Sequence, residues 1–343
     1  MLSERNTALD IVEFLKSEQD KDIEKFESWT GIGVDRTAFT ARAINDSYCI
    51  IYPPPELTET VYRGQTKFYS NCFSSIHRGA PTALEVFIER LKAVEFELLI
   101  KKHPFVKGFA NEKIENHLIR IDYEGLAQHY ELKTELIDLT SDPYVAGFFA
   151  TCRYNREKGE YAPVEEKDTI GVIYGYDFML DYPSNKDKQY SHGIGLQPLP
   201  RPETQKAFSY RLRKGERFNK MNRVSIFKFY HQPSVSNTFY DMFQGGKSLF
   251  PDDLIASKAA EIRSAQVFSN PAFVLAFSRY WNNNNADSLR NKINGMKIDI
   301  VADEVINFTE KEMARLQEEW PRVRTEFRSK FKFRRVIHPE PVG

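Results

Sequence analysis

The sequence contains little cysteine. Its 343 residues include three, Cys49, Cys72 and Cys152, which are too few and too widely spaced for a disulfide framework. No group of His, Cys, Asp and Glu residues has the spacing of a zinc site, and no Gly-x-Ser-x-Gly sequence marks a serine hydrolase. The cysteine usage fits a reducing compartment, and neither a metal centre nor a serine hydrolase is indicated.

An excess of one charge and long apolar runs are also missing. Lys and Arg number 48 and Asp and Glu number 48, so any binding to nucleic acid depends on a local patch rather than an overall field. No run of about 18 apolar residues predicts a membrane span. The polar start, residues 1–6, lacks the regions of a signal peptide. We therefore expect a soluble cytoplasmic protein without membrane contact.

The patterns that are present predict an α+β fold. Hydrophobic residues make up 41% of the chain, enough for a sizeable core. Runs rich in β-branched and aromatic residues predict one strand that ends near Arg63 and three more over 135–139, 169–176 and 224–230. Apolar residues three or four positions apart predict helices over 10–26, 84–102, 112–130, 143–154 and most of the chain after 252, interrupted at Pro321.

These elements suggest three parts. Residues 1–57 are expected to form a helical N-terminal extension, residues 58–265 a mixed central domain, and residues 266–343 a helical region with a basic tail. Polar residues, Gly and Pro over 181–202 predict a long surface loop within the central domain.

The first candidate site residue is Arg63, in the sequence Tyr62-Arg63-Gly64-Gln65. Its guanidinium offers five donors in a planar fork that suits phosphate or carboxylate, and Gly64 would permit an unusual turn after the strand. Arg63 is interpreted equally well as an anion ligand and as the partner of a structural carboxylate.

The second candidate group follows the predicted helix over 112–130. Gln128, His129 and Tyr130 stand at its end, and Asp138 and Thr140 lie two residues apart on one face of the next strand. These polar groups point toward one place. Alternatively, Asp138 and Thr140 cap the following helix, and both roles are compatible because a helix N-terminus also favours an anion.

A third segment, 198–208, leads into a predicted short strand that carries Gln205. Together the three segments resemble the FRG domain family, named for its Phe/Tyr-Arg-Gly motif. The resemblance covers roughly residues 58–262, and its most specific part is the central block of 126–150. This chain departs from the family pattern at Glu135, where Arg is usual, at Leu139, where Trp is usual, and at Ala207, where Gly is usual.

The FRG pattern in turn is similar to the ADP-ribosyltransferase fold, which implies a mixed sheet core with flanking helices and NAD as the substrate. The resemblance implies that Arg63 clamps the NAD diphosphate or ribose and that Thr140 orients the nicotinamide ribose. Gln205 occupies the place of a catalytic glutamate. An amide can only hydrogen-bond there, so Asp138 or Glu203 would have to supply the negative charge that stabilises the developing cation.

The candidate site therefore consists of possible catalytic groups and ligand-binding groups. The possible catalytic residues are Gln205, Asp138 and His129. The possible cofactor-binding residues are Arg63, Gly64, Gln128, Tyr130 and Thr140.

The resemblance further implies a toxin-like or anti-phage transferase or NAD glycohydrolase that acts on an unidentified protein or nucleic-acid acceptor. A non-catalytic module that binds a nucleotide or a protein in the same cleft is the alternative.

A basic aromatic tail offers a separate nucleic-acid hypothesis. Basic residues between Arg322 and Arg335 alternate with Phe327, Phe331 and Phe333, a composition that can bind phosphates and stack on bases. The favoured interpretation is a solvated helix face that packs through its aromatic residues and pairs with the acidic stretch 310–319.

Overall fold

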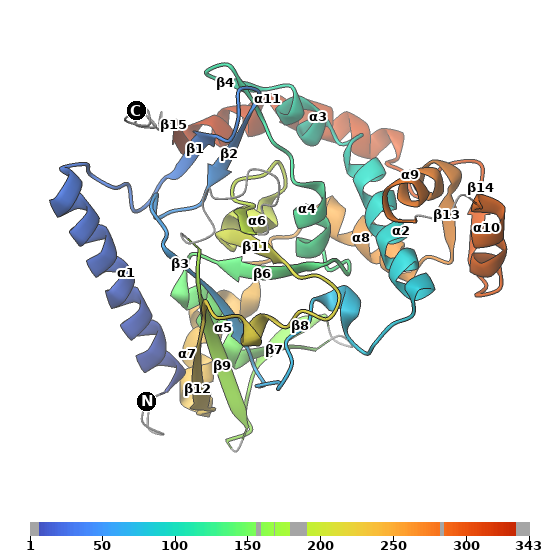
Figure 1. The fold of residues 1–343 in the computed structure, drawn as a ribbon. Coiled ribbons are helices and arrows are strands. Elements are labelled where there is room, and N and C mark those ends of the chain that lie inside the picture. Colours follow the sequence, from blue (N-terminus) through green and yellow to red (C-terminus); the bar gives the residue numbers. More distant parts are fainter. Residues whose placement is uncertain (1–6, 156–158, 168, 179–190, 282–284, 334–343) are drawn as a thin grey trace, which may run out of the picture.

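The computed structural model describes residues 7–155, 159–167, 169–178, 191–281 and 285–333, and confirms a mixed α+β architecture. Its centre is a six-stranded sheet in the order β10-β11-β6-β3-β9-β12 (Figure 1). The strands are β10 Ser191–Gly193, β11 Ala207–Arg211, β6 Leu136–Thr140, β3 Thr60–Gln65, β9 Ile170–Asp177 and β12 Val224–Tyr230. Four of the five strands predicted from the sequence are present; the exception is the short strand expected to carry Gln205. Part of the predicted loop over 181–202 lies outside the described residues, and the rest contains β10, an irregular stretch and the start of a short helix, α6 Pro200–Thr204.

The central sheet is divided between β3 and β6. All six residues of β3 pair with β9, and all five residues of β6 pair with β11. By contrast, β3 and β6 share one registered pair, Tyr62 with Thr140. Beyond that pair the two strands part, so one half of the sheet contains β10, β11 and β6 and the other contains β3, β9 and β12.

Helix α5, Pro143–Thr151, packs directly against β3. The packing depends on Gly64, because a Cβ at this position would lie 1.9 Å from the carbonyl oxygen of Ala146 and 2.6 Å from the nitrogen of Ala150. Gly64 lies inside the strand and has no positive φ, so the predicted turn after Arg63 is wrong. The glycine is needed for the close approach of a helix, not for a turn.

The outer side of α5 is covered by α1, Ala8–Thr30, which confirms the predicted N-terminal helix. Figure 1 shows α1 at one side of the molecule, with α7 Pro233–Met242 near α5. The predicted helix over 143–154 ends early, because β7 Cys152–Asn155 follows and pairs with β8 Glu160–Pro163.

The rest of the N-terminal segment is not helical. Strands β1 Phe39–Ala43 and β2 Tyr48–Tyr52 belong to a second sheet, in the order β15-β1-β2-β5-β4. Its edge strand β15, Phe331–Phe333, comes from the C-terminal region and pairs in parallel with β1. The expectation that residues 1–57 are helical is therefore wrong after α1: β1 pairs with its neighbour β2, and β15 is too distant in the sequence to leave a local pattern.

The expected helix over 112–130 is also wrong in its first half. Residues in this range form a hairpin of β4 Lys113–Ile114 and β5 His117–Ile119, and helix α4 begins only at Tyr123 and ends at His129. Glu115 adopts a φ of 51° in the turn, which breaks any helix there. Upstream, α2 Ala83–Ile100 and its predicted capping box, Thr82 with Glu85, are confirmed.

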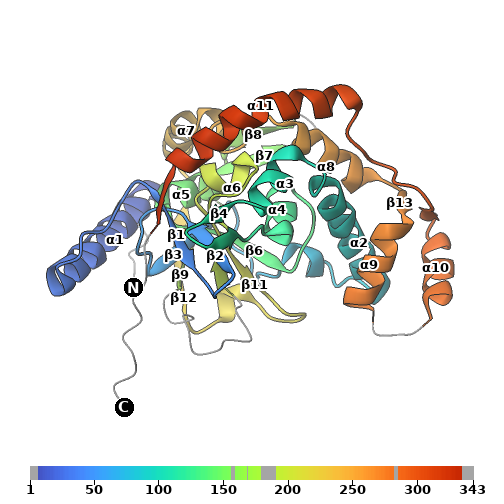
Figure 2. The same ribbon diagram turned by 90° about the horizontal axis from the view of Figure 1, so that it is seen from above.

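The C-terminal region packs back onto these elements. Helix α9 lies against α2, and α11 crosses one side of the molecule over α3 (Figure 2). Pro321 stands inside α11 without ending it, so the predicted interruption is wrong. The bounds are α3 Pro104–Ala110, α8 Leu254–Ser264, β13 Val267–Ser269, α9 Asn270–Tyr280, α10 Ala286–Asn294, β14 Asp299–Val301 and α11 Glu310–Ser329.

The Gly64 contact leads to the first prediction. Gly64→Ala should lower the free energy of unfolding by about 1–3 kcal/mol, the usual cost of forcing extra atoms into a packed core. The matched control is Gly175→Ala in β9, where the nearest atom to a new Cβ is Thr60 Cγ2 at 3.4 Å. Urea unfolding of both variants is the measurement. Equal stability of the two variants would show that α5 does not need Gly64.

Candidate functional site

Arg63 lies at the point where β3 and β6 part. Its Nη1 donates a hydrogen bond of 2.9 Å to the backbone carbonyl of Asp138, and its Nε is buried without a partner among the described residues. Its contact is therefore not the carboxylate expected for a structural ion pair. The side chain spans the gap in the sheet and keeps a buried, unused donor next to it.

Asp138 and Gln128 are brought together, as the sequence predicted. Gln128 Nε2 donates to Asp138 Oδ2 at 3.0 Å, and the hydroxyl of Thr134 donates to Gln128 Oε1 at 2.6 Å. This chain of contacts fixes the orientation of the Gln128 amide and holds one oxygen of the carboxylate. The other oxygen, Asp138 Oδ1, is buried and has no partner in the described part of the chain.

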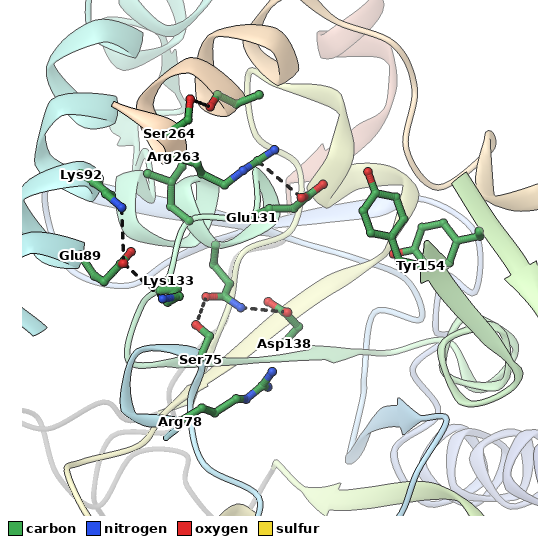
Figure 3. A pocket seen from close by; sticks show the side chains of 14 residues that line it. Ser75, Arg78, Glu89, Lys92, Glu131, Lys133, Asp138, Tyr154, Arg263 and Ser264 are labelled. Atoms are coloured by element: carbon green, nitrogen blue, oxygen red, sulfur yellow. Dashed lines mark hydrogen bonds and ion pairs between the residues drawn. The ribbon is translucent and has the colours of Figure 1, made fainter. Parts of the chain in front are cut away.

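A cavity of about 930 Å³ opens at Gln128 and Asp138. Figure 3 shows Arg78 and Asp138 on one side of it, with Glu131 and Tyr154 on another. The cavity is lined by four cationic and three acidic side chains: Arg78, Lys92, Lys133, Arg263, Glu89, Glu131 and Asp138. Glu89 pairs with Lys92 and Lys133, and Glu131 pairs with Arg263 (Figure 3). Arg78 has no such carboxylate partner among the described residues.

The charges around Arg78 are coupled to Arg63 and Asp138. Desolvation and the neighbouring guanidinium of Arg63 lower the pKa of Arg78, and the carboxylate of Asp138 opposes this. The two guanidiniums and the carboxylate therefore form one electrostatic group. Arg78 lies in the irregular segment between β3 and α2, where no periodic pattern marks its direction, and the sequence therefore did not identify it.

His129 and Gln205 contact one another in the interior, where neither lines the cavity. His129 Nδ1 and Gln205 Oε1 are 2.9 Å apart, and Gln205 Nε2 donates to the carbonyl of Leu249 at 3.0 Å. Gln205 terminates α6 rather than standing in a strand, so that part of the expectation is wrong. Thr140 donates its hydroxyl to the carbonyl of Gln205 at 2.7 Å. These contacts tie α4, α6 and β6 together.

Tyr130 is likewise buried behind the cavity wall. Its hydroxyl donates to Asp253 Oδ2 at 2.5 Å, and the Arg201 guanidinium lies 4.7 Å from the ring centre. Burial and the Asp253 carboxylate raise the pKa of Tyr130.

The sequence also allowed Asp138 and Thr140, at the end of β6, to cap the following helix, α5. This alternative is wrong, because the N-cap of α5 is Asp142, whose side chain accepts the hydrogen bond from Tyr144 N. Thr140 instead accepts a bond from Asp142 N.

Glu135, which stands where the FRG pattern usually has Arg, is neutralised by arginines that do not line the cavity. Glu135 pairs with Arg90 and with Arg211, which also binds Glu124. The other carboxylate considered from the sequence, Glu203, pairs with Lys330. Among Asp138, Glu203 and Gln205, only Asp138 lines the large cavity.

The basic tail packs on the core through an aromatic residue, as the favoured interpretation expected, but its basic side chains pair with other carboxylates than those of 310–319. Phe327 is buried against Phe109, with ring centres 3.8 Å apart. Arg324 and Arg328 pair with Glu112 rather than with the acidic stretch 310–319. Lys332 pairs with Asp35, and residues 334 and 335 lie outside the described residues. Much of the tail's positive charge is thus neutralised within the fold.

Comparison with known families matches the FRG domain to residues 58–159. The match supports an FRG domain over the segment that carries Arg63, Gly64, Gln128, Asp138 and Thr140, whereas Gln205 lies beyond it. No curated protein and no solved structure matches the chain. Among the helices that the structure describes, none has the length and apolar character needed to cross a membrane.

The burial of His129 leads to the second prediction. Desolvation lowers the pKa of His129 in the folded state. As the pH falls below about 6.5, the ordinary histidine value, the unfolded chain takes up a proton that the folded chain does not, so stability falls. His129→Gln should therefore lose less unfolding free energy than the wild type between pH 7 and pH 5. Urea unfolding at both pH values tests this, and an identical loss would refute it.

Proposed function

We propose that the cavity at the parted strands binds a nucleotide, with NAD as the ligand, in an ADP-ribosyltransferase-like site. One observation carries the proposal: the sheet opens between β3 and β6 at the Arg63–Asp138 contact, and Asp138 lines a cavity of about 930 Å³, whereas Arg63 is not one of its lining residues. Four cationic side chains line it, which favours phosphate groups, and arginine in particular suits their planar arrangement of oxygens. Arg78 is the lining guanidinium that forms no ion pair with a carboxylate of the described residues.

Asp138 is the group best placed for chemistry on such a ligand. When the bond between nicotinamide and ribose breaks, positive charge develops at the anomeric carbon, and a fixed carboxylate stabilises it. Asp138 lines the cavity, and Gln128 holds one of its oxygens at 3.0 Å. In this proposal Asp138 supplies the negative charge that Gln205 cannot, and Gln205 and His129 keep the wall behind it in place.

Water or an acceptor nucleophile would then attack the anomeric carbon from the side opposite to the departing nicotinamide. The first case is NAD hydrolysis and the second is transfer of ADP-ribose. A role as a toxin or in phage defence is proposed on the FRG resemblance alone.

A non-catalytic module is the second candidate, and a specific observation favours it. Both side-chain polar atoms of Gln205 are engaged by His129 and by Leu249, away from the cavity. The residue proposed to stand in the place of the ADP-ribosyltransferases' catalytic glutamate is therefore an amide with a structural role. This candidate predicts ligand binding in the same cavity without release of nicotinamide.

Calorimetry with NAD and a nicotinamide-release assay provide the third prediction. Wild-type protein should bind NAD, and Arg78→Ala, which removes a guanidinium that lines the cavity, should weaken binding about tenfold or more, in line with the ~1.5–3 kcal/mol of a hydrogen bond to a charged group. Asp138→Asn should retain binding and lose release. The matched control is Arg322→Ala, which removes an exposed arginine that pairs with Glu326 on the surface of α11.

The outcomes separate the two candidates. Binding with release that disappears in Asp138→Asn supports the enzyme, and binding without release by the wild type supports the module. Absence of NAD binding by the wild type, or equal weakening by the Arg78 and Arg322 variants, would refute the nucleotide site. Thermal unfolding of each variant reports whether the fold is kept.

A further inference from the structure

A second cavity, of about 680 Å³, adjoins the first. Both cavities are lined by Glu131, Tyr154 and Tyr161, so these residues form the boundary between them. The remaining wall of the second cavity comes from the start of β8, which carries Glu160, from α6, and from the end of α7 with the segment that follows it, including Asp241 and Phe250. None of the sequence-predicted site residues lines it.

Aromatic rings form one side of the second cavity. Tyr161 stacks on Phe250 with ring centres 5.1 Å apart and an interplanar angle of 23°, and Tyr154 lies 5.1 Å from Tyr161. The guanidinium of Arg201 lies 5.5 Å from the centre of Phe250, which is within the range of a cation–π contact. The wall thus already holds one guanidinium against an aromatic face.

The charge of the second cavity differs from that of the first. Four carboxylates and two cations line it. The carboxylates are Glu131, Glu160, Asp241 and Asp252, and the cations are Arg201 and Lys247. Glu131 is engaged by Arg201 at 3.7 Å and by Arg263 at 3.5 Å. Glu160, Asp241 and Asp252 are exposed and form no ion pair with another described residue. The first cavity has an excess of cations and the second an excess of carboxylates.

Arg201 adds an unsatisfied donor to this wall. The residue is 8% exposed, and its Nε has no hydrogen-bond partner within the described ranges. Its Nη1 already donates to the carbonyl of His129 at 3.2 Å. A buried donor without a partner is costly, and a backbone carbonyl of an incoming peptide is a suitable acceptor. A peptide with a basic side chain therefore matches both the carboxylates and the donor.

We propose that the second cavity binds an arginine side chain of a basic peptide segment in a partner protein. The planar guanidinium stacks on the tyrosine rings and donates to the carboxylates of Glu160 and Asp241. Because Glu131 and Tyr154 line both cavities, the guest lies beside whatever occupies the first one. Recognition of the arginine needs no nucleotide and stands independently of the proposed NAD site.

The fourth prediction uses a fluorescently labelled, capped (Gly-Arg)4 peptide without nucleotide, at low salt, and fluorescence anisotropy. The same peptide with citrulline, which is neutral and of similar shape, should bind at least about fivefold more weakly. The variant Glu160→Gln/Asp241→Asn should weaken binding of the arginine peptide about three- to tenfold, as expected for two partly exposed ion pairs. Higher salt should weaken the wild-type interaction.

The control is Glu24→Gln/Glu318→Gln, which removes the same charge from exposed positions on α1 and α11 that line neither cavity. This control should bind the peptide like the wild type. Tyr154→Leu, which removes a partly exposed ring, should also weaken binding. Equal affinity for arginine and citrulline, or an equal loss in the two double variants, would overturn the proposal. Because nucleotide is absent, failure of NAD binding does not affect the result.

Discussion

The contact of α5 with β3 at Gly64 is the constraint on which the candidate site depends. Only two residues separate the start of helix α5, Pro143, from Thr140, the last residue of β6. A helix backbone held against β3 therefore also determines where β6 ends relative to β3. The strands meet at Tyr62 and Thr140 and then part, and Arg63 reaches the carbonyl of Asp138 across the opening. A larger side chain at residue 64 would alter this whole arrangement.

Two kinds of polar group surround the opening. His129, Gln205 and Thr140 satisfy one another and the nearby backbone in the interior, so they hold the wall in position. Asp138 and Gln128 line the cavity, and Arg63 and Asp138 each keep a buried atom that has no partner in the part of the chain the structure describes. Unsatisfied buried groups are uncommon in folded proteins, and here they occur beside a cavity. This contrast separates residues that build the site from those proposed to use it.

Local patterns predicted much of the fold. The capping box at Thr82 and the strands around Arg63 and Asp138 were predicted because their signals lie within a few residues. Strand β1 pairs with its neighbour β2 and also with β15, from the other end of the chain, and Glu115 breaks the predicted helix through its turn conformation. Such features depend on tertiary contacts and are not visible in a short window of sequence.

The same limit applies to the site. Gln128 and Asp138 are ten residues apart and were predicted to converge, which the structure confirms. Arg78 and Arg263 line the same cavity from an irregular segment and from α8, and no spacing rule connects them to Arg63. Family order placed Gln205 with the others, but only side-chain packing reveals that it faces His129 and not the cavity.

The parallel pairing of β15 with β1 has a consequence for folding. Phe39 lies opposite Phe331, so the five-stranded sheet joins segments from early and late in the chain. Contacts of such long sequence separation form slowly, because closing a long loop costs entropy before the contact is made. During synthesis β1 must remain without this neighbour until residues 331–333 have left the ribosome. Until then its unpaired edge is exposed to other strands, and completion of the sheet is a late event in folding.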